Sequence, residues 1–133
     1  MGPDFALLTD LVCSYDLREA IEVGHILEEL DFVWLEEPMH DMSLTSQWLI
    51  QGAIDRLRGN ARHGTTQVLK LAHLAELHNT YIELNGQGGL FGRIHAHLGC
   101  CIDNTDYYEY LNAGGDGLRK AGQQWVLLNA PLI

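Results

Sequence analysis

Five short apolar runs divide this chain, and each leads into a polar side chain. The runs cover residues 5–10, 32–38, 53–58, 80–85 and 107–111. The polar residues at or just past their ends are Asp10, Glu36, Asn60, Asn85 and Glu109, at steps of 24 to 26 residues. A steady step of this length corresponds to one strand plus one returning helix, as in a (β/α) barrel. Right-handed crossovers would place all five residues at the same edge of one parallel sheet.

The stretches between the runs have the spacing of amphipathic helices. Asp16 followed by Glu19 is close to a capping box, and apolar residues then recur every three or four positions as far as Leu30. Further helices are predicted over residues 66–78 and 94–102. The interval between Glu36 and Asn60 holds only a polar turn and a short apolar piece, so we expect no full helix there. The predicted fold is α/β: a partial TIM-type barrel of about five parallel strands with outer helices, in one domain over residues 1–133.

Composition narrows the class of protein. A chain of 133 residues with 47% hydrophobic residues suits one globular domain. No apolar run approaches the ~20 residues that span a bilayer, and the N-terminus does not have the layout of a signal peptide. Cys13, Cys100 and Cys101 are an odd number without metal-type spacing, which predicts a reducing, cytoplasmic location and small buried thiols. A formal charge of −10 argues against nucleic acid or anionic membrane as a partner.

Carboxylates at two strand ends predict a cation site. The run from Val33 stops at Glu36, Glu37 and Pro38, and proline does not continue a central strand. The first run likewise ends on Asp10. Parallel α/β folds hold ligands at the carboxyl ends of their strands, and Mg²⁺ prefers oxygen ligands. Asp10 and Glu36 are therefore the candidate metal ligands.

Several motifs together resemble the enolase superfamily, in its mandelate racemase-like, acid-sugar dehydratase branch. They are Gly2 to Phe5 leading to Thr9-Asp10, Tyr15 to Ile21, Phe32 to Pro38, Gly52 to Asp55, Lys70 to Glu76 and Tyr107 to Glu109. The resemblance runs from residue 2 to about residue 111 and corresponds to the C-terminal barrel domain, leaving residues 112–133 weakly assigned. In the tail, residues 125–128 could form a short strand on a sheet edge.

This resemblance implies Mg²⁺-dependent proton abstraction next to the carboxylate of an acid sugar, followed by dehydration, epimerisation or racemisation. The metal stabilises the ene-diolate that forms, and a lysine or histidine is the base. By resemblance Asp10 and Glu36 are metal ligands, and Glu109 hydrogen-bonds the intermediate. Asn60 and Asn85 occupy the positions of the acid and the histidine of the general-base pair. His97 resembles a family histidine near the substrate, although a surface or packing role is the simpler interpretation for it and for His95.

The chain departs from this family where the chemistry is concentrated. Asn60 and Asn85 cannot accept a proton at neutral pH. The strand that bears the third metal ligand, a lysine-bearing strand and the capping domain all have no counterpart in the sequence. Arg56 falls in a strand that is apolar in the family, where we expect a costly unpaired charge. We therefore expect a truncated domain with impaired or lost activity and at most weak Mg²⁺ binding, whose open edges favour self-association.

Two alternatives remain open. The Gly86–Gly92 loop lies between a strand and a helix, a placement typical of phosphate loops. Its spacing is one residue away from the dinucleotide fingerprint, but a phosphate- or nucleotide-binding module is one alternative function. The other is a non-catalytic scaffold that assembles through its sheet edges.

Overall fold

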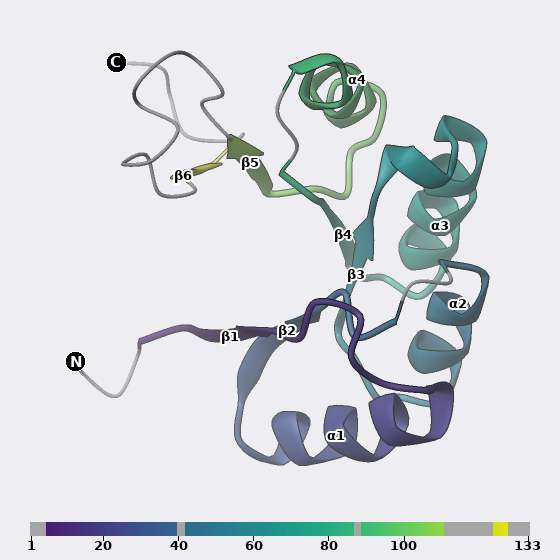
Figure 1. Ribbon diagram of the computed structural model, residues 1–133, viewed down its shortest axis with the longest axis vertical. Helices are drawn as coiled ribbons and strands as arrows, with labels where there is room; N and C mark the ends of the chain where they lie inside the picture. Colours follow the sequence, from purple (N-terminus) through teal and green to yellow (C-terminus); the bar gives the residue numbers. More distant parts are fainter. Residues whose placement is uncertain (1–4, 40–41, 87–88, 111–123, 128–133) are drawn as a thin grey trace.

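The computed structural model describes residues 5–39, 42–86, 89–110 and 124–127 (Figure 1). Its helices are α1 (Leu17–Glu29), α2 (Met42–Ile50), η1 (Ala61–His63, a 3₁₀ turn), α3 (Thr65–Leu77) and α4 (Gly89–Gly99). Its strands are β1 (Leu7–Asp10), β2 (Phe32–Glu36), β3 (Arg56–Gly59), β4 (Tyr81–Leu84), β5 (Tyr107–Tyr110) and β6 (Gln124–Leu127). Within the described part of the chain, no helix is long and apolar enough to span a membrane.

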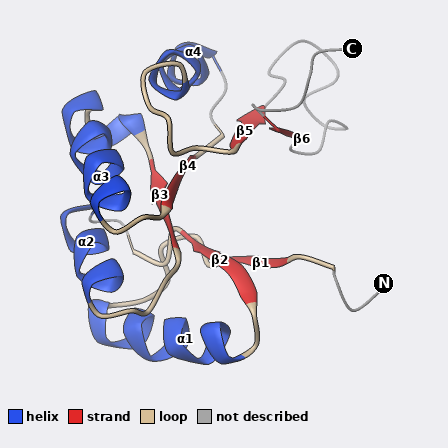
Figure 2. Ribbon diagram, turned by 180° about the vertical axis from the view of Figure 1, so that it is seen from behind, coloured by secondary structure: helices blue, strands red, loops and turns tan. Residues whose placement is uncertain are grey.

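The strands form two sheets that do not close. β1 pairs in parallel with β2, and this register places Asp10 opposite Glu36. β3, β4 and β5 form a parallel sheet, and β6 is added antiparallel to β5. Helices α1, α2 and α3 lie together along one side of these strands (Figure 2). The α/β fold with parallel strands and outer helices is thus confirmed, and its open sheets fit a partial barrel.

Local signals predicted most elements correctly. The Asp16 carboxylate accepts the N–H of Glu19 at 2.9 Å, and the Glu19 carboxylate accepts the N–H of Asp16 at 3.0 Å, so the capping box of α1 is present. α3 begins one residue before its predicted start, and β6 is the predicted edge strand of the tail. Leu128 of that prediction lies outside the described residues.

The expectation that no full helix fits between β2 and β3 is wrong. Residues 42–50 form α2, which packs against α1, α3 and β3. Trp48 of α2 is buried, and its carbonyl accepts the N–H of Ala53 in the turn that follows. Tertiary burial of Trp48 therefore outweighs the turn-like polar residues at the start of this segment. The same turn delays β3, which begins at Arg56 instead of residue 53.

The apolar core lies between the strands and α3. Leu57, Ile82 and Leu84 point towards α3 and are fully buried. Gly59 is also on this side, because a side chain there would meet Val68 of α3 and both Ile82 and Leu84. Side chains alternate along a strand, so the residues between these positions point to the opposite, inner side of the sheet.

Candidate functional site

The inner side of the sheet is lined with charged and aromatic side chains. Arg56 and Arg58 alternate with Leu57 on β3, and Glu83 lies between Ile82 and Leu84 on β4. On β5, the Tyr108 hydroxyl donates to the Gly92 carbonyl of α4, which leaves Tyr107 and Glu109 on the inner side. Trp34 and Glu36 have the same orientation on β2, because Leu35 between them belongs to the core.

Five of these side chains make a hydrogen-bonded group at the carboxyl ends of the strands, which we call the strand-end cluster: Glu36, Arg58, Asn60, Asn85 and Glu109. Arg58 Nη2 contacts both the Glu36 carboxylate and the Glu109 carboxylate, the latter at 3.2 Å. Asn85 Nδ2 donates to Glu36 Oε1 at 3.2 Å, and Asn60 Nδ2 donates to Asn85 Oδ1 at 3.0 Å. All five residues are buried. Four of the residues predicted from the strand ends therefore lie together, and Arg58 is the member that the sequence reasoning missed.

Asp10 lies beside this cluster and outside its hydrogen bonds. It is opposite Glu36 in the β1–β2 ladder, but its side chain is exposed, and its Oδ1 accepts the N–H of Val12 at 3.0 Å. Burial raises the pKa of Glu36, and the nearby charges of Glu109 and Asp10 raise it further, while the Arg58 guanidinium lowers it. The Arg58 guanidinium is therefore shared by Glu36 and Glu109, while Asp10 adds negative charge near Glu36.

Glu109 is held by backbone as well as by Arg58. The Gly86 N–H donates to Glu109 Oε2, and a Cβ at residue 86 would overlap the Glu109 carboxyl group. Glycine at this position thus allows the close approach. The other oxygen, Glu109 Oε1, is buried and has no hydrogen-bond partner among the described residues.

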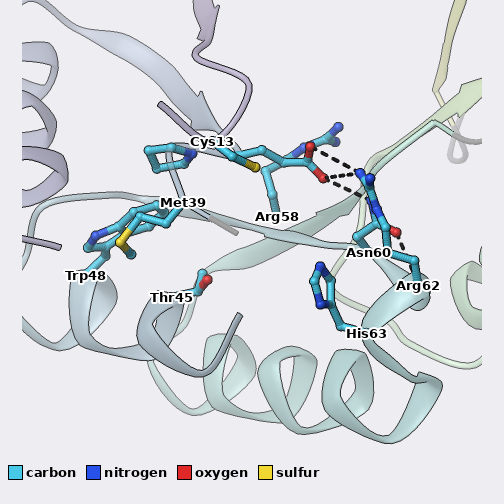
Figure 3. Close-up of a pocket in the computed structure, with 10 residues that line it drawn as sticks. Cys13, Met39, Thr45, Trp48, Arg58, Asn60, Arg62 and His63 are labelled. Atoms are coloured by element: carbon cyan, nitrogen blue, oxygen red, sulfur yellow. Dashed lines mark hydrogen bonds and ion pairs between the residues drawn. The ribbon is translucent and has the colours of Figure 1, made fainter. Parts of the chain in front are cut away.

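A small cavity opens next to the cluster, beneath the loops that follow β1 and β2 (Figure 3). Its volume of about 20 Å³ is room for about one water molecule. Across its mouth Glu37 accepts hydrogen bonds from Asn60 at 3.0 Å and from Arg62 at 3.3 Å. The pKa of the Cys13 thiol is raised, first by burial and then by Glu37, so this cysteine is not an activated nucleophile.

The residues present do not fit a tightly bound magnesium ion. In the described part of the chain no three His, Cys, Asp or Glu side chains gather in a way that could hold a metal. Glu36, one of the two expected ligands, is already paired with Arg58. At an effective dielectric constant of about 20, a divalent ion about 5 Å from a guanidinium group is repelled by about 7 kcal/mol. A metal at Asp10 and Glu36 would therefore have to overcome the charge of Arg58.

Asn60 and Asn85, which the resemblance assigns to the general-base pair, are amides that bond to each other. The Asn60–Asn85 hydrogen bond joins the ends of β3 and β4, so an acid and a histidine at these two positions would be within reach of one another. His95 of α4 is fully buried, and its Nε2 accepts the Ala61 N–H at 2.7 Å. Burial lowers the pKa of His95, and the charges of Arg58 and Arg62 add to this lowering. His95 therefore has a structural role, in agreement with the prediction of a packing role. His97 is exposed, and no hydrogen bond or ion pair joins it to the described residues of the strand-end cluster.

The expectation of an unpaired charge at Arg56 is wrong. Arg56 Nη1 lies 2.5 Å from Glu83 Oε1, and Nη2 lies 3.0 Å from Asp106 Oδ2. Its guanidinium also lies over the ring of Tyr81, 4.8 Å from the centroid. Glu83 in turn accepts the N–H of Tyr107 at 3.0 Å. Arg56 thus belongs to a second ion-pair layer, one step further from the strand ends than the strand-end cluster.

The glycine loop does not present a free phosphate cradle at Gly86. The Gly86 N–H, which would begin a phosphate cradle, already donates to the internal carboxylate of Glu109. Residues 87 and 88 lie outside the described residues, and α4 begins at Gly89, five residues before its predicted start.

The three cysteines are free thiols, but Cys100 and Cys101 are exposed, so the expectation that they are buried is wrong.

Parallel strands with outer helices and carboxylates gathered at their carboxyl ends define the class of partial (β/α) barrels with an acidic strand-end site. Three solved structures to which this chain is similar are the following. D-glucarate dehydratase from Agrobacterium tumefaciens, in a complex with magnesium, is 27% identical, with a TM-score of 0.53; the match covers 84% of this chain and 35% of that chain. A candidate mandelate racemase/muconate lactonizing enzyme from Pseudovibrio sp. is 18% identical, with a TM-score of 0.56 and coverage of 85% and 38%. A member of the enolase superfamily from Salmonella Typhimurium is 20% identical, with a TM-score of 0.53 and coverage of 78% and 34%.

The resemblance to the enolase superfamily that the motifs indicate is confirmed: the chain resembles part of the barrel of these enzymes. It spans a little more than a third of the length of each. No protein-family model and no curated protein matches the chain.

Proposed function

We propose that this chain is a derivative of the magnesium-dependent acid-sugar dehydratases and racemases in which α-proton abstraction is impaired or lost. The observation that carries this proposal is the Asn60–Asn85 pair. Proton abstraction needs a group that can accept a proton within hydrogen-bond reach of the substrate. At both expected positions the chain instead has an amide, which can only donate and accept hydrogen bonds.

The proposed ligand positions follow the same resemblance. Asp10 and Glu36 are the residues that would hold a metal ion, and the magnesium complex of the Agrobacterium dehydratase supports Mg²⁺ as that ion. When bound, the ion would supply positive charge to a substrate carboxylate. Because Arg58 engages Glu36, we propose that Mg²⁺ binds weakly at most. Glu109 would face the substrate, and an acid sugar such as D-glucarate is the proposed substrate class.

Proton exchange tests this function directly. The chain is incubated with D-glucarate and Mg²⁺ in D₂O, and the proton next to each carboxylate is followed by ¹H NMR. We expect no loss of that signal above the protein-free rate. Exchange by the wild type that disappears in Glu109→Gln would overturn the proposal.

A matched variant separates the two defects of the site. Asn60→Asp combined with Asn85→His restores an acid and a base at positions already 3.0 Å apart, without changing Arg58. Exchange in this variant alone would identify the missing base as the limiting defect. A folded variant without exchange would show that the missing base is not the limiting defect.

Self-association is a second proposed function, and the apolar surface of β1 favours it. Leu7 and Leu8 are each 42% exposed, and among the described strands β1 pairs only with β2. An exposed apolar edge strand is a template for pairing with another chain. Multi-angle light scattering should give a mass above the 14.9 kDa of one chain, and Leu8→Lys should restore the monomer. A monomeric wild type would contradict this second proposal.

A further inference from the structure

We propose that the Arg58 guanidinium is a resident cation that takes the place of a divalent metal ion in the strand-end cluster. Its side chain is 3% exposed and touches carboxylates of two different strands, Glu36 of β2 and Glu109 of β5. Arg58 Nη1 also donates to the Leu84 carbonyl of β4 at 3.3 Å. One side chain of β3 therefore contacts three other strands, as a metal ion shared by strand ends would.

The two buried carboxylates, Glu36 and Glu109, explain why a positive charge is needed at the position of the Arg58 guanidinium. β2 and β5 belong to separate sheets, so no shared ladder fixes the distance between Glu36 and Glu109. Two buried carboxylates repel each other unless a positive charge lies between them. The guanidinium lies between them, and its centre is 6.0 Å from the ring of Trp34, which limits its freedom to move away. Because this cation is covalently part of the chain, a chelator cannot remove it.

The inference predicts a gain of metal binding when the guanidinium is removed. Without Arg58, the Glu36 and Glu109 oxygens lose their cation, and Glu109 Oε1 already has no partner among the described residues. Asp10 lies opposite Glu36 as a further oxygen donor. Carboxylate oxygens from strand ends are the ligands that Mg²⁺ and Mn²⁺ accept. The inference goes beyond the proposed function, because it concerns metal binding by the substrate-free chain.

Mn²⁺ binding, measured by electron paramagnetic resonance with Mg²⁺ as competitor, tests the inference. Arg58→Met should bind Mn²⁺ at least tenfold more tightly than the wild type, and adding Glu36→Gln should abolish the gain. Arg56→Met is the matched control, since it removes a neighbouring arginine that contacts neither Glu36 nor Glu109, and it should leave Mn²⁺ affinity unchanged. A folded Arg58→Met protein without the gain, or an equal gain in Arg56→Met, would overturn the inference.

Thermal unfolding covers the case in which Arg58→Met is unstable. The midpoint of the wild type should not change with Mg²⁺ or with a chelator, whereas Mg²⁺ should raise the midpoint of Arg58→Met or allow it to fold. If Arg58→Met does not fold with or without metal, wild type and Glu36→Gln decide the question. Mn²⁺ affinities within tenfold of each other support a resident cation, and a larger loss in Glu36→Gln overturns it.

Discussion

Replacing Arg56 by methionine should destabilise the fold through the carboxylate that it leaves behind. The guanidinium is 21% exposed, but its partner Glu83 is fully buried. Breaking a buried ion pair by removing one partner costs about 3–5 kcal/mol. Arg56 is partly exposed, and Glu83 keeps its bonds from the Tyr107 N–H and the Thr105 hydroxyl. We therefore expect a loss at the lower end, about 3 kcal/mol, out of the 5–15 kcal/mol typical of a domain.

The pH dependence of this loss identifies its cause. Burial raises the pKa of Glu83 even in the presence of Arg56. The stability that Glu83 contributes to the fold is therefore fully present below the ordinary glutamate pKa, and it is lost as the pH rises through the pKa of Glu83 in the folded protein. Removing the cation raises that pKa further. The deficit of Arg56→Met should therefore be larger at pH 8 than at pH 5.

Urea unfolding followed by the fluorescence of the buried Trp34 and Trp48 measures the deficit at both pH values. Arg56→Met combined with Glu83→Gln removes both charges and should recover about half of the loss. A loss below about 1 kcal/mol at pH 8, as for an exposed pair, would refute the reasoning. So would a loss that does not change with pH.

Two further changes test neighbouring parts of the site. Gly86→Ala should lower the free energy of unfolding, measured with urea, by about 3 kcal/mol, because the new Cβ displaces Glu109 from the Gly86 N–H and from Arg58. An unchanged urea midpoint would contradict the close approach of Glu109 to Gly86. The pKa of His95 is lowered by burial, so its contribution is present above the ordinary histidine value and is lost as the pH falls below about 6.5, by up to about 1.4 kcal/mol per pH unit. Between pH 7.5 and 5.5 the wild type should lose more stability than His95→Gln, and equal losses would show that His95 is not buried as a neutral ring.

The local parts of this fold could be predicted from the sequence, since their signals lie within a few residues. The capping box of α1 needs only Asp16 and Glu19, and β1, β2, β4 and β5 each lie within one of the predicted apolar runs. α2 could not be predicted in this way. Its first residues have the composition of a turn, and burial of Trp48 against other elements makes the segment helical.

The pairing of buried charges is the part of the site that could not be predicted from the sequence, because it depends on contacts between residues far apart along the chain. Arg56 finds its partners 27 and 50 residues further along the chain, so its local context wrongly indicates an unpaired charge. Arg58 depends on Glu36 and Glu109, which precede and follow it on other strands. A signal was nevertheless present, because Arg56, Leu57 and Arg58 alternate with the period of a strand that has one charged side.

The two-stranded ladder between β1 and β2 has a consequence for how the molecule opens. All four residues of β1 are at least partly exposed, and two-stranded ladders are marginal by themselves. Backbone amides in β1 should therefore exchange with deuterium through local fraying, while those of β4, buried between β3 and β5, exchange only in rarer, larger openings. Asp10 thus lies on a strand that should detach by local fraying, and Glu36 lies on the strand that remains in place when β1 detaches.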